Sequence, residues 1–381
     1  MKNLIPFIIF TFYSFLAISQ ITNFKEKFDL PEETKETSGL LFFDSKIITH
    51  NDSGNNANLF EIDSLSGNLL RTISISNATN IDWEDITEDE NHIYIADIGN
   101  NNGNRIDLKI YKILKSDFKK STSVSAEIIS FSYEDQTNFD SKPNGSNFDA
   151  ESIVVFNNSI LIFTKNWNDL KTNVYKTPLI KGDYEAKKVS SANVGGLITG
   201  GVYNDNRFFL TGYNTSLIPF LIYISPNRKP GEDIFFSGFN KISLETELGQ
   251  GSQLEGITNI GLTGNYYISR EHFTTTINGN PYNFTQKLYE FYDETNPLLS
   301  FTENKLKKIT ISPNPLTNKI KINTSSHLLD FEIYNSLGKK MHSPTINSLK
   351  EIDLSNLKRG VYIIKIKFNG EKSAVRKIIK L

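Results

Sequence analysis

Three glutamates that recur along the chain are the residues best suited to chemistry. Glu84, Glu151 and Glu255 each occupy the second position of a short apolar strand pattern. If these strands share an axis, the three carboxylates meet there and repel one another unless positive charge compensates. A hard divalent cation such as Ca²⁺ is one solution, because it takes several oxygen ligands from carboxylates, amides and backbone carbonyls. The three glutamates are therefore the predicted metal ligands, and calcium is the cofactor expected at such a site.

Polar residues at or directly after the ends of four of the five second strands form the predicted ligand-binding set. They are His50, Asp52, Asp97, Lys165, Arg270 and Glu271. Three of them, Lys165, Arg270 and His50, offer the alternative to a cation, since buried charges usually find partners within the protein. Both solutions stay open at the level of the sequence.

Catalysis is a second use for the same residues. Glu84 or Asp97 would act as general base on a metal-bound water, while Lys165 and Arg270 would hold an anionic substrate. The chain has no G-x-S-x-G elbow, no H-E-x-x-H motif and no complete EF-hand loop, so none of these known sites is predicted. Three functions stay open: a module that binds a ligand through an acidic face, a calcium-dependent hydrolase of phosphate esters, lactones or other esters, and a purely structural surface protein.

The elements that position these residues form a repeat. First strands begin at residues 37–40, 83–86, 150–153, 199–202 and 254–257, and second strands cover residues 47–52, 93–97, 160–165, 208–212 and 266–270. The second positions of the five starts are 46, 67, 49 and 55 residues apart. In an antiparallel hairpin the start of the first strand lies beside the end of the second, so the polar residues converge on one face.

Units of about 40–50 residues with four strands each are typical of β-propellers. The predicted fold is all-β: a five-bladed β-propeller over residues 20–294, with an insertion at residues 133–148 in the long second unit. Six blades, or a two-sheet sandwich in place of a propeller, are the alternatives. Residues 24–30 alternate correctly to supply an outer strand to the last unit and close the ring. In architecture only, the body resembles phytase-like and lactonase-like propellers, which use calcium in the axial opening, and no catalytic residue is carried over.

Two tryptophans have alternative interpretations. Trp83 and Trp167 would stack on sugar rings, or Trp83 packs in the core between repeats. The large burial of aromatic side chains favours the core position for Trp83.

Composition limits the classes of protein to which the chain can belong. The chain has 381 residues and no cysteine, which excludes disulfides, thiolate metal sites and thiol nucleophiles. The net charge is −2, but residues 305–381 hold 16 Lys and Arg against 5 Asp and Glu, so the rest of the chain is acidic. An acidic body lacks the basic patch that phosphate backbones require, so no nucleic-acid partner is predicted.

The N-terminus has the pattern of a secretory signal. Lys2 precedes an apolar run that ends at Ala17-Ile18-Ser19, a small-x-small cleavage pattern. The run is shorter than the roughly 20 apolar residues that span a bilayer. We expect cleavage of residues 1–19 and no transmembrane segment in the mature chain; an N-terminal anchor helix is the alternative.

A different module follows residues 295–308, which form a predicted linker. Short alternating strands at residues 309–311, 319–322, 331–334, 361–367 and 374–379 have one apolar face and one lysine-rich face. This pattern predicts a small antiparallel β-sandwich.

Residues 309–381 resemble the type A C-terminal sorting domain of type IX secretion cargo. The resemblance lies in the sequences at residues 311–315, 333–339, 352–362 and 377–380, and its motif residues are Pro313, Asn314, Pro315, Gly338, Gly360 and Tyr362. It implies a Gram-negative cell, interaction with the type IX secretion machinery, and a destination outside the outer membrane, either secreted or on the cell surface. The extracellular ligand of the body would be a glycan, a protein or a small anionic ester. An ordinary immunoglobulin-like accessory domain is the alternative for this module.

Overall fold

The computed structural model describes residues 21–204, 206–224, 233–261, 263–277, 279–294, 310–323, 328–335, 338–341, 351–368 and 372–381. The predicted signal sequence and linker lie outside these residues.

Five antiparallel hairpins carry the repeat. Their strands are β2 (Thr37–Phe43) with β3 (Lys46–Asn51), β6 (Trp83–Glu88) with β7 (His92–Asp97), β11 (Ala150–Phe156) with β12 (Ser159–Thr164), β15 (Leu197–Asn204) with β16 (Arg207–Tyr213), and β19 (Leu254–Asn259) with β20 (Asn265–Arg270). The alternation of apolar residues locates each of these strands correctly. The prediction of a nearly all-β fold is confirmed.

Outer strands extend each hairpin. The first sheet has the order β2-β3-β4-β5-β9, where β4 is Asn58–Asp63, β5 is Leu69–Ile75 and β9 is Ser123–Val124. A four-stranded sheet has the order β15-β16-β17-β18, with β17 (Pro219–Ile224) and β18 (Asn240–Ser243). The last has the order β1-β23-β20-β19, with β1 (Ile21–Asp29) and β23 (Lys287–Asp293). The N-terminal strand therefore completes the last sheet, as predicted.

The second and third repeats share one eight-stranded sheet. Its order is β11-β12-β13-β14-β10-β8-β7-β6, which includes β8 (Lys109–Leu114), β10 (Glu127–Tyr133), β13 (Thr172–Pro178) and β14 (Gly182–Ala192). Outer strands β10 and β14 pair in parallel, and the edge strands β6 and β11 contact each other. The sheet is therefore nearly closed and barrel-like. The sequence pattern does not predict this pairing, which covers two edges that would otherwise be open.

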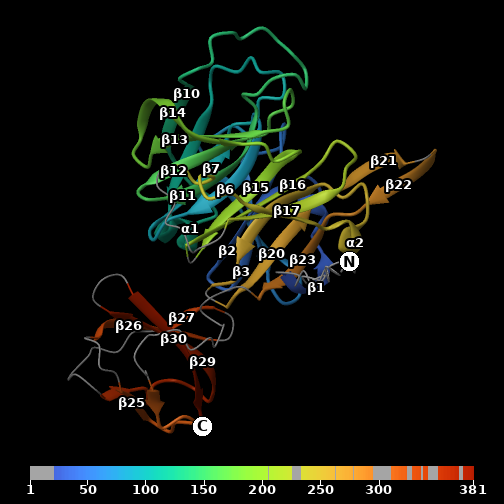
Figure 1. Ribbon diagram of the computed structural model, residues 1–381. Coiled ribbons are helices and arrows are strands. Elements are labelled where there is room, and N and C mark those ends of the chain that lie inside the picture. The colour runs from blue at the N-terminus through green and yellow to red at the C-terminus, as the bar shows by residue number, and fades with distance from the viewer. Residues whose placement is uncertain are drawn as a thin grey trace, which may run out of the picture.

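The five first strands contact one another in cyclic order. Strand β2 contacts β6, β6 contacts β11, β11 contacts β15, β15 contacts β19, and β19 contacts β2. Figure 1 shows β6, β11 and β15 side by side within the body.

A β-bulge lies near the start of every first strand. The extra residues fall at Ser38, Glu84, Glu151, Thr199 and Glu255. The three glutamates are thus equivalent, as expected. In the fourth repeat, the sequence pattern aligns Gly200 with the glutamates, but the bulge lies one residue earlier, at Thr199. The alignment was wrong because the neighbouring glycines have no side chains that would mark the register in the sequence.

The residue after each bulge lies against the next first strand. A Cβ atom on Gly39 would lie 2.5 Å from the backbone nitrogen of Ile86, and one on Gly256 would lie 2.5 Å from Cβ of Leu40. Asp85 has the equivalent position, and its Oδ2 accepts the backbone N–H of Ile153 at 2.9 Å. These contacts run around the whole cycle, and Gly256 closes it.

Few helices accompany the strands. The described residues include a 3₁₀ turn η1 (Glu32–Thr34) and two short helices, α1 (Lys115–Lys120) and α2 (Glu245–Leu248). A hairpin of β21 (Phe273–Ile277) and β22 (Asn280–Phe284) extends away from the body (Figure 1). None of the helices in the described part of the chain has the length and apolarity needed to cross a bilayer.

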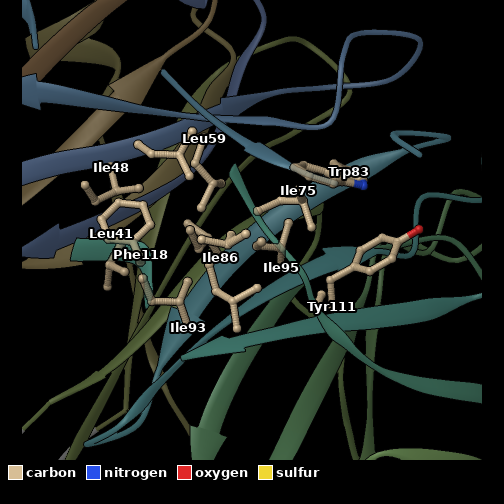
Figure 2. Packing of buried hydrophobic residues seen from close by; sticks show 14 residues of the cluster. Leu41, Ile48, Leu59, Ile75, Trp83, Ile86, Ile93, Ile95, Tyr111 and Phe118 are labelled. Atoms are coloured by element: carbon tan, nitrogen blue, oxygen red, sulfur yellow. The ribbon is translucent and has the colours of Figure 1, made fainter. Parts of the chain in front are cut away.

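Apolar clusters fill the space between successive repeats. Figure 2 shows Leu41 and Ile48 of the first repeat packed with Ile86 and Ile95 of the second. Trp83 is fully buried in this cluster and donates its indole N–H to the carbonyl of Thr79 at 3.2 Å. Trp83 is therefore a core residue, and its ring has no exposed surface.

The C-terminal residues form two antiparallel sheets. One has the order β24-β25-β28, with β24 (Thr310–Ser312), β25 (Lys319–Asn323) and β28 (Glu351–Asp353). The other has the order β27-β26-β29-β30, with β27 (Lys340–Met341), β26 (Leu328–Asn335), β29 (Gly360–Phe368) and β30 (Lys372–Lys380). Both sheets contribute to one apolar cluster, which includes Ile320, Ile352, Phe331 and Ile364.

Replacing Gly256 tests the closure of the cycle. A methyl group there would overlap Leu40 and approach the Ser38 carbonyl oxygen at 2.7 Å. We expect Gly256→Ala to lower the free energy of unfolding by about 1–3 kcal/mol, as overpacking typically does, measured by urea titration. Gly145→Ala is the matched control, since its Cβ would meet no atom closer than 3.5 Å. Equal effects of the two substitutions would contradict this role of Gly256.

Asp85 gives the cycle a pH dependence. Burial raises the pKa of Asp85 from 3.8 to about 8, despite the backbone N–H groups of Ile153 and Ile86 that favour its ionised form. The folded protein therefore holds this proton more tightly than the unfolded chain. Its stabilising effect is complete below about pH 4 and is lost as the pH rises through about 8, at up to about 1.4 kcal/mol per pH unit.

We therefore expect Asp85→Asn to flatten the fall in unfolding free energy between pH 5 and pH 8, measured by urea titration at each pH. Glu90→Gln, in an exposed turn, should leave the slope unchanged. Parallel slopes for the wild type and Asp85→Asn would disprove this assignment.

Candidate functional site

The repeated glutamates converge with a shared aspartate. Glu84, Glu151 and Glu255 are 4%, 3% and 6% exposed. Asp52, which follows β3, interacts electrostatically with each of the three glutamates and with Glu271. The ends of different first and second strands thus meet on one face, as the hairpin geometry predicts.

Three carboxylates lie close enough to hold one metal ion. Oxygens of Asp52, Asp82 and Glu84 all lie within 4.8 Å of one another. The expected set of Glu84, Glu151 and Glu255 does not form a group of this kind. Only Glu84 belongs to both sets, because Glu151 and Glu255 lie on different repeats around the ring, whereas Asp52 and Asp82 lie in the loops beside Glu84.

Asn80 joins the two loops that carry the aspartates. Its amide nitrogen donates to the carbonyls of Asn51 (3.0 Å) and Asp52 (2.7 Å), while its Oδ1 accepts the N–H of Trp83 (3.0 Å). Asp82 is fixed in turn, because its N–H donates to Oδ1 of Asp97 at 3.2 Å. Hydrogen bonds therefore hold the two loops together, and the carboxylates of Asp52, Asp82 and Glu84 lie close to one another.

Because Gly99 has no side chain, the carboxylates of Glu84 and Asp82 can lie next to its backbone. A Cβ atom at this position would overlap Oε1 of Glu84 and Oδ2 of Asp82. The backbone of Gly99 donates its N–H to the carbonyl of Asp82 at 3.1 Å, so the loop after β7 packs directly against the carboxylate group.

Burial and mutual repulsion raise the pKa values of the group. The pKa of Asp82 rises to about 7 through burial and then through the charge of Asp52. Burial, followed by Asp52 and Glu151, raises the pKa of Glu84 well above its ordinary value. Burial and the charge of Asp52 raise the pKa of Glu271 to about 8. A cation placed among these groups would reverse their repulsion.

Two cations of this face are engaged elsewhere. Arg105 donates to Oδ1 of Asp97 at 2.8 Å and to Oδ1 of Asp107 at 3.0 Å. Lys165 forms an ion pair with Oε1 of Glu151, and although burial lowers the Lys165 pKa, the Glu151 carboxylate raises it further and keeps the ammonium charged. Among the described residues, neither Arg105 nor Lys165 forms an ion pair with Glu84.

His50 and Arg270 take positions away from the carboxylates. His50 is fully buried and packs edge-on against Trp83, with ring centroids 5.6 Å apart; burial lowers its pKa to about 4, so the ring is neutral. Arg270 donates to the carbonyl of Thr285 at 2.8 Å and lies 5.3 Å from the ring of Phe284. Of the three predicted neutralising residues, only Lys165 meets a glutamate.

The remaining predicted ligand-binding residues differ in access. Asp97 is fully buried, and its ion pair with Arg105 leaves Oδ2 as an unpartnered oxygen among the described residues. Glu271 accepts a hydrogen bond from Gln253 at 2.9 Å and lies near Glu255, whose pKa is raised by burial and by the charge of Glu271. Asp52 and Glu271 are half-buried and accessible.

Sequence reasoning missed Asp82 and Asp149. Each stands two residues before a repeated glutamate, in Asp82-Trp83-Glu84 and Asp149-Ala150-Glu151. The alternation of side chains along a strand would have placed both acids of each D-x-E pair on one face. Asp149 accepts the indole N–H of Trp167 at 2.8 Å, so it positions an aromatic ring beside the carboxylates.

The C-terminal motifs hold the last strand in place. Asn314 donates its amide to the carbonyl of Lys377 (2.8 Å), and its Oδ1 accepts the N–H of Ile379 (2.9 Å). Leu316 and Ile379 add a backbone hydrogen bond of 2.8 Å. Tyr362 donates its hydroxyl to the carbonyl of Lys358 at 2.8 Å.

Residues 310–381 match the family of secretion system C-terminal sorting domains. The predicted type IX sorting tail is confirmed. This tail implies interaction with the type IX secretion machinery, and secretion or cell-surface placement in Bacteroidetes. The chain matches none of the curated proteins.

Solved structures resemble the chain only distantly. An exo-β-1,3-galactanase from Phanerochaete chrysosporium is 11% identical with a TM-score of 0.42, over 94% of this chain and 100% of the other. An oxidoreductase described as a glucose dehydrogenase, from Thermus thermophilus, is 8% identical with a TM-score of 0.36, over 71% and 99%. A DUF4623 family protein from Bacteroides eggerthii is 12% identical with a TM-score of 0.35, over 68% and 71%. These values support no activity for this chain.

Proposed function

We propose that the chain is a type IX secretion cargo whose body binds an extracellular ligand on its acidic face, through a divalent cation held by Asp52, Asp82 and Glu84. One observation carries the proposal: oxygens of these three carboxylates lie within 4.8 Å of one another. Like charges at such a distance are held together at a cost that a cation would remove.

A five-bladed β-propeller is the architecture that we propose for the body. The cyclic contacts of the five first strands support it, and so does the N-terminal strand that completes the last sheet. A ring of this kind gathers loops from all repeats at one end of its axis. The tail is proposed to form a small sandwich of its two sheets.

The chemistry of the donors fits a hard cation. All three groups offer carboxylate oxygens, which Ca²⁺ prefers. Glu84 is 4% exposed, and its carboxylate accepts no hydrogen bond and forms no ion pair within the described part of the chain. Oε2 of Glu151 nearby is likewise buried without a partner among those residues. A buried carboxylate without partners is costly, so binding a cation would compensate this charge and anchor a ligand through its oxygens.

Hydrolysis of phosphate esters, lactones or other esters is the second candidate. One observation favours it: Asp82 has a pKa of about 7, raised by burial and by Asp52. A carboxylate of this pKa suits general-base chemistry near neutral pH. Asp97 is less suited to that role than expected, because Arg105 occupies one of its oxygens.

Calcium should stabilise the protein through this group. We expect the melting temperature to rise when Ca²⁺ is added to chelator-treated protein, since a ligand at 100 times its Kd stabilises the folded state by about 2.7 kcal/mol. Glu84→Gln and Asp82→Asn should abolish the rise, because each removes a ligand charge. Scanning calorimetry with and without EDTA, together with metal analysis, provides the measurement.

Glu255→Gln is the informative control for this experiment. It removes one of the glutamates first predicted from the repeat but leaves the group of Asp52, Asp82 and Glu84 intact, so the calcium response should persist. Loss of the response in Glu255→Gln would favour the three repeated glutamates as ligands, and no response in the wild type would refute the cation. Turnover of a phosphoester and lactone panel that disappears in Glu84→Gln would favour the hydrolase.

The tail should depend on Asn314 for export. Asn314→Ala removes two hydrogen bonds to β30. We expect it to leave cargo in the periplasm, as deletion of residues 305–381 should do more completely, because the last strand is no longer held. Fractionation of the native cell and immunoblotting give the measurement.

Thr317→Ala, in the same loop and equally exposed, should be exported normally. Normal surface delivery of Asn314→Ala would show that the clamp on β30 is dispensable. Normal delivery of the deletion would refute the sorting role of the whole tail.

A further inference from the structure

A polar hollow lies in the insertion of the second repeat. Its volume is about 200 Å³. The wall contains amide and hydroxyl side chains, the carboxylates of Asp135 and Asp140, the single ammonium group of Lys142, and the aromatic ring of Phe148. A concave polar wall with one aromatic ring offers hydrogen-bonding groups and a flat apolar surface to a small polar ligand.

Hydrogen bonds hold the insertion in place. Gln136 donates its amide to the carbonyl of Gly103 at 2.9 Å. Backbone N–H groups of Lys142 and Asn144 donate to the carbonyls of Asn102 (2.8 Å) and Asn101 (2.9 Å). The hollow is thus built on the loop after β7, the same loop in which Gly99 packs against Glu84. A prearranged wall loses little conformational entropy when a ligand binds.

The hollow has unused donors and acceptors for hydroxyl groups. Oδ1 of Asn147 accepts the N–H of Asn168 at 3.2 Å, which leaves the Asn147 amide N–H groups free among the described residues. The side chains of Asn168 and Thr137 likewise make no hydrogen bond within the described part of the chain. Amides and hydroxyls both donate and accept, as the hydroxyls of a sugar do.

Trp167 connects the hollow with the carboxylates. Its backbone N–H donates to the carbonyl of Ser146, a residue of the hollow, at 3.1 Å. Its indole N–H donates to Oδ2 of Asp149 at 2.8 Å, and Nζ of Lys165 lies 5.0 Å from its ring. The half-buried ring is therefore oriented by Asp149, while its backbone is bound to Ser146 of the hollow.

We infer that the ligand of this face is a neutral saccharide, which occupies the hollow, contacts the ring of Trp167 and extends toward the carboxylates. The placement of the saccharide's second end near the carboxylates rests on the proposed function. An aromatic ring offers a flat apolar surface to a sugar face, and carboxyl groups hydrogen-bond with hydroxyls in either protonation state. The excess of carboxylates disfavours anionic ligands, and the concave polar wall suits a small neutral unit better than a protein surface.

Affinity electrophoresis of the full chain tests this inference. Native gels contain one neutral polysaccharide each: laminarin, xylan, galactan, mannan or starch. We expect at least one of them to retard the protein, and the matching oligosaccharide to bind in titration calorimetry. Trp167→Ala and Asn168→Ala should each weaken binding about 10-fold or more, whereas Phe236→Ala, an exposed aromatic (84%) that does not line the hollow, should not.

Trp167→Phe keeps a ring but loses the bond to Asp149, so it should retain more binding than Trp167→Ala; melting temperatures confirm that all variants fold. No retardation by any polysaccharide would overturn the inference while leaving a calcium response untouched. Retardation that Trp167→Ala does not weaken would overturn the assigned location. Saccharide binding without any calcium response would support the inference and refute the cation.

Discussion

The body depends on the close approach of its five first strands at one position in each repeat. Gly39, Gly200 and Gly256 occupy that position where backbone meets backbone, and Asp85 occupies it where a carboxylate accepts the N–H of Ile153. The β-bulge lies directly before this position and adds one residue to the strand. A bulge changes the direction in which the side chain of the added residue points. In three repeats this residue is a glutamate, so the contact that closes the ring also brings the carboxylates together.

This coupling explains how the fold tolerates charges that repel. The cycle of strands and the apolar clusters between repeats are formed by side chains that do not face the carboxylates. Asn80 and Gly99 then fix the loops from which Asp52 and Asp82 extend. The repulsion between carboxylates is confined to one face, while the rest of the fold follows the usual rules of packing and pairing. Such a local loss of stability is typical of functional sites.

Much of the fold follows from local sequence, and much of the site does not. Period-2 alternation located all five hairpins and the N-terminal strand, because each buries one or both faces. The parallel pairing of β10 with β14 depends on two strands far apart in the chain and leaves no local pattern. Of the three clustered carboxylates, only Glu84 was predicted as a metal ligand, and Asp52 was predicted as a ligand-binding residue. Asp82 was missed because it lies just before β6, outside the strand positions from which the repeat was recognised. His50 and Arg270 were placed on the correct strand ends, but their side chains turn into apolar and aromatic surroundings.

The loops, and not the ring, give this face its individual character. A ring of repeats fixes where the strand ends lie, and loops on such a scaffold can vary without disturbing it. Here one loop, after β7, carries three features at once: Gly99 against the carboxylates, Arg105 on Asp97, and backbone carbonyls that hold the insertion. This loop therefore contacts both the acidic group and the insertion that forms the hollow. Under the proposed function, the two surfaces are parts of one face, and Trp167 links them through its hydrogen bonds to Asp149 and Ser146.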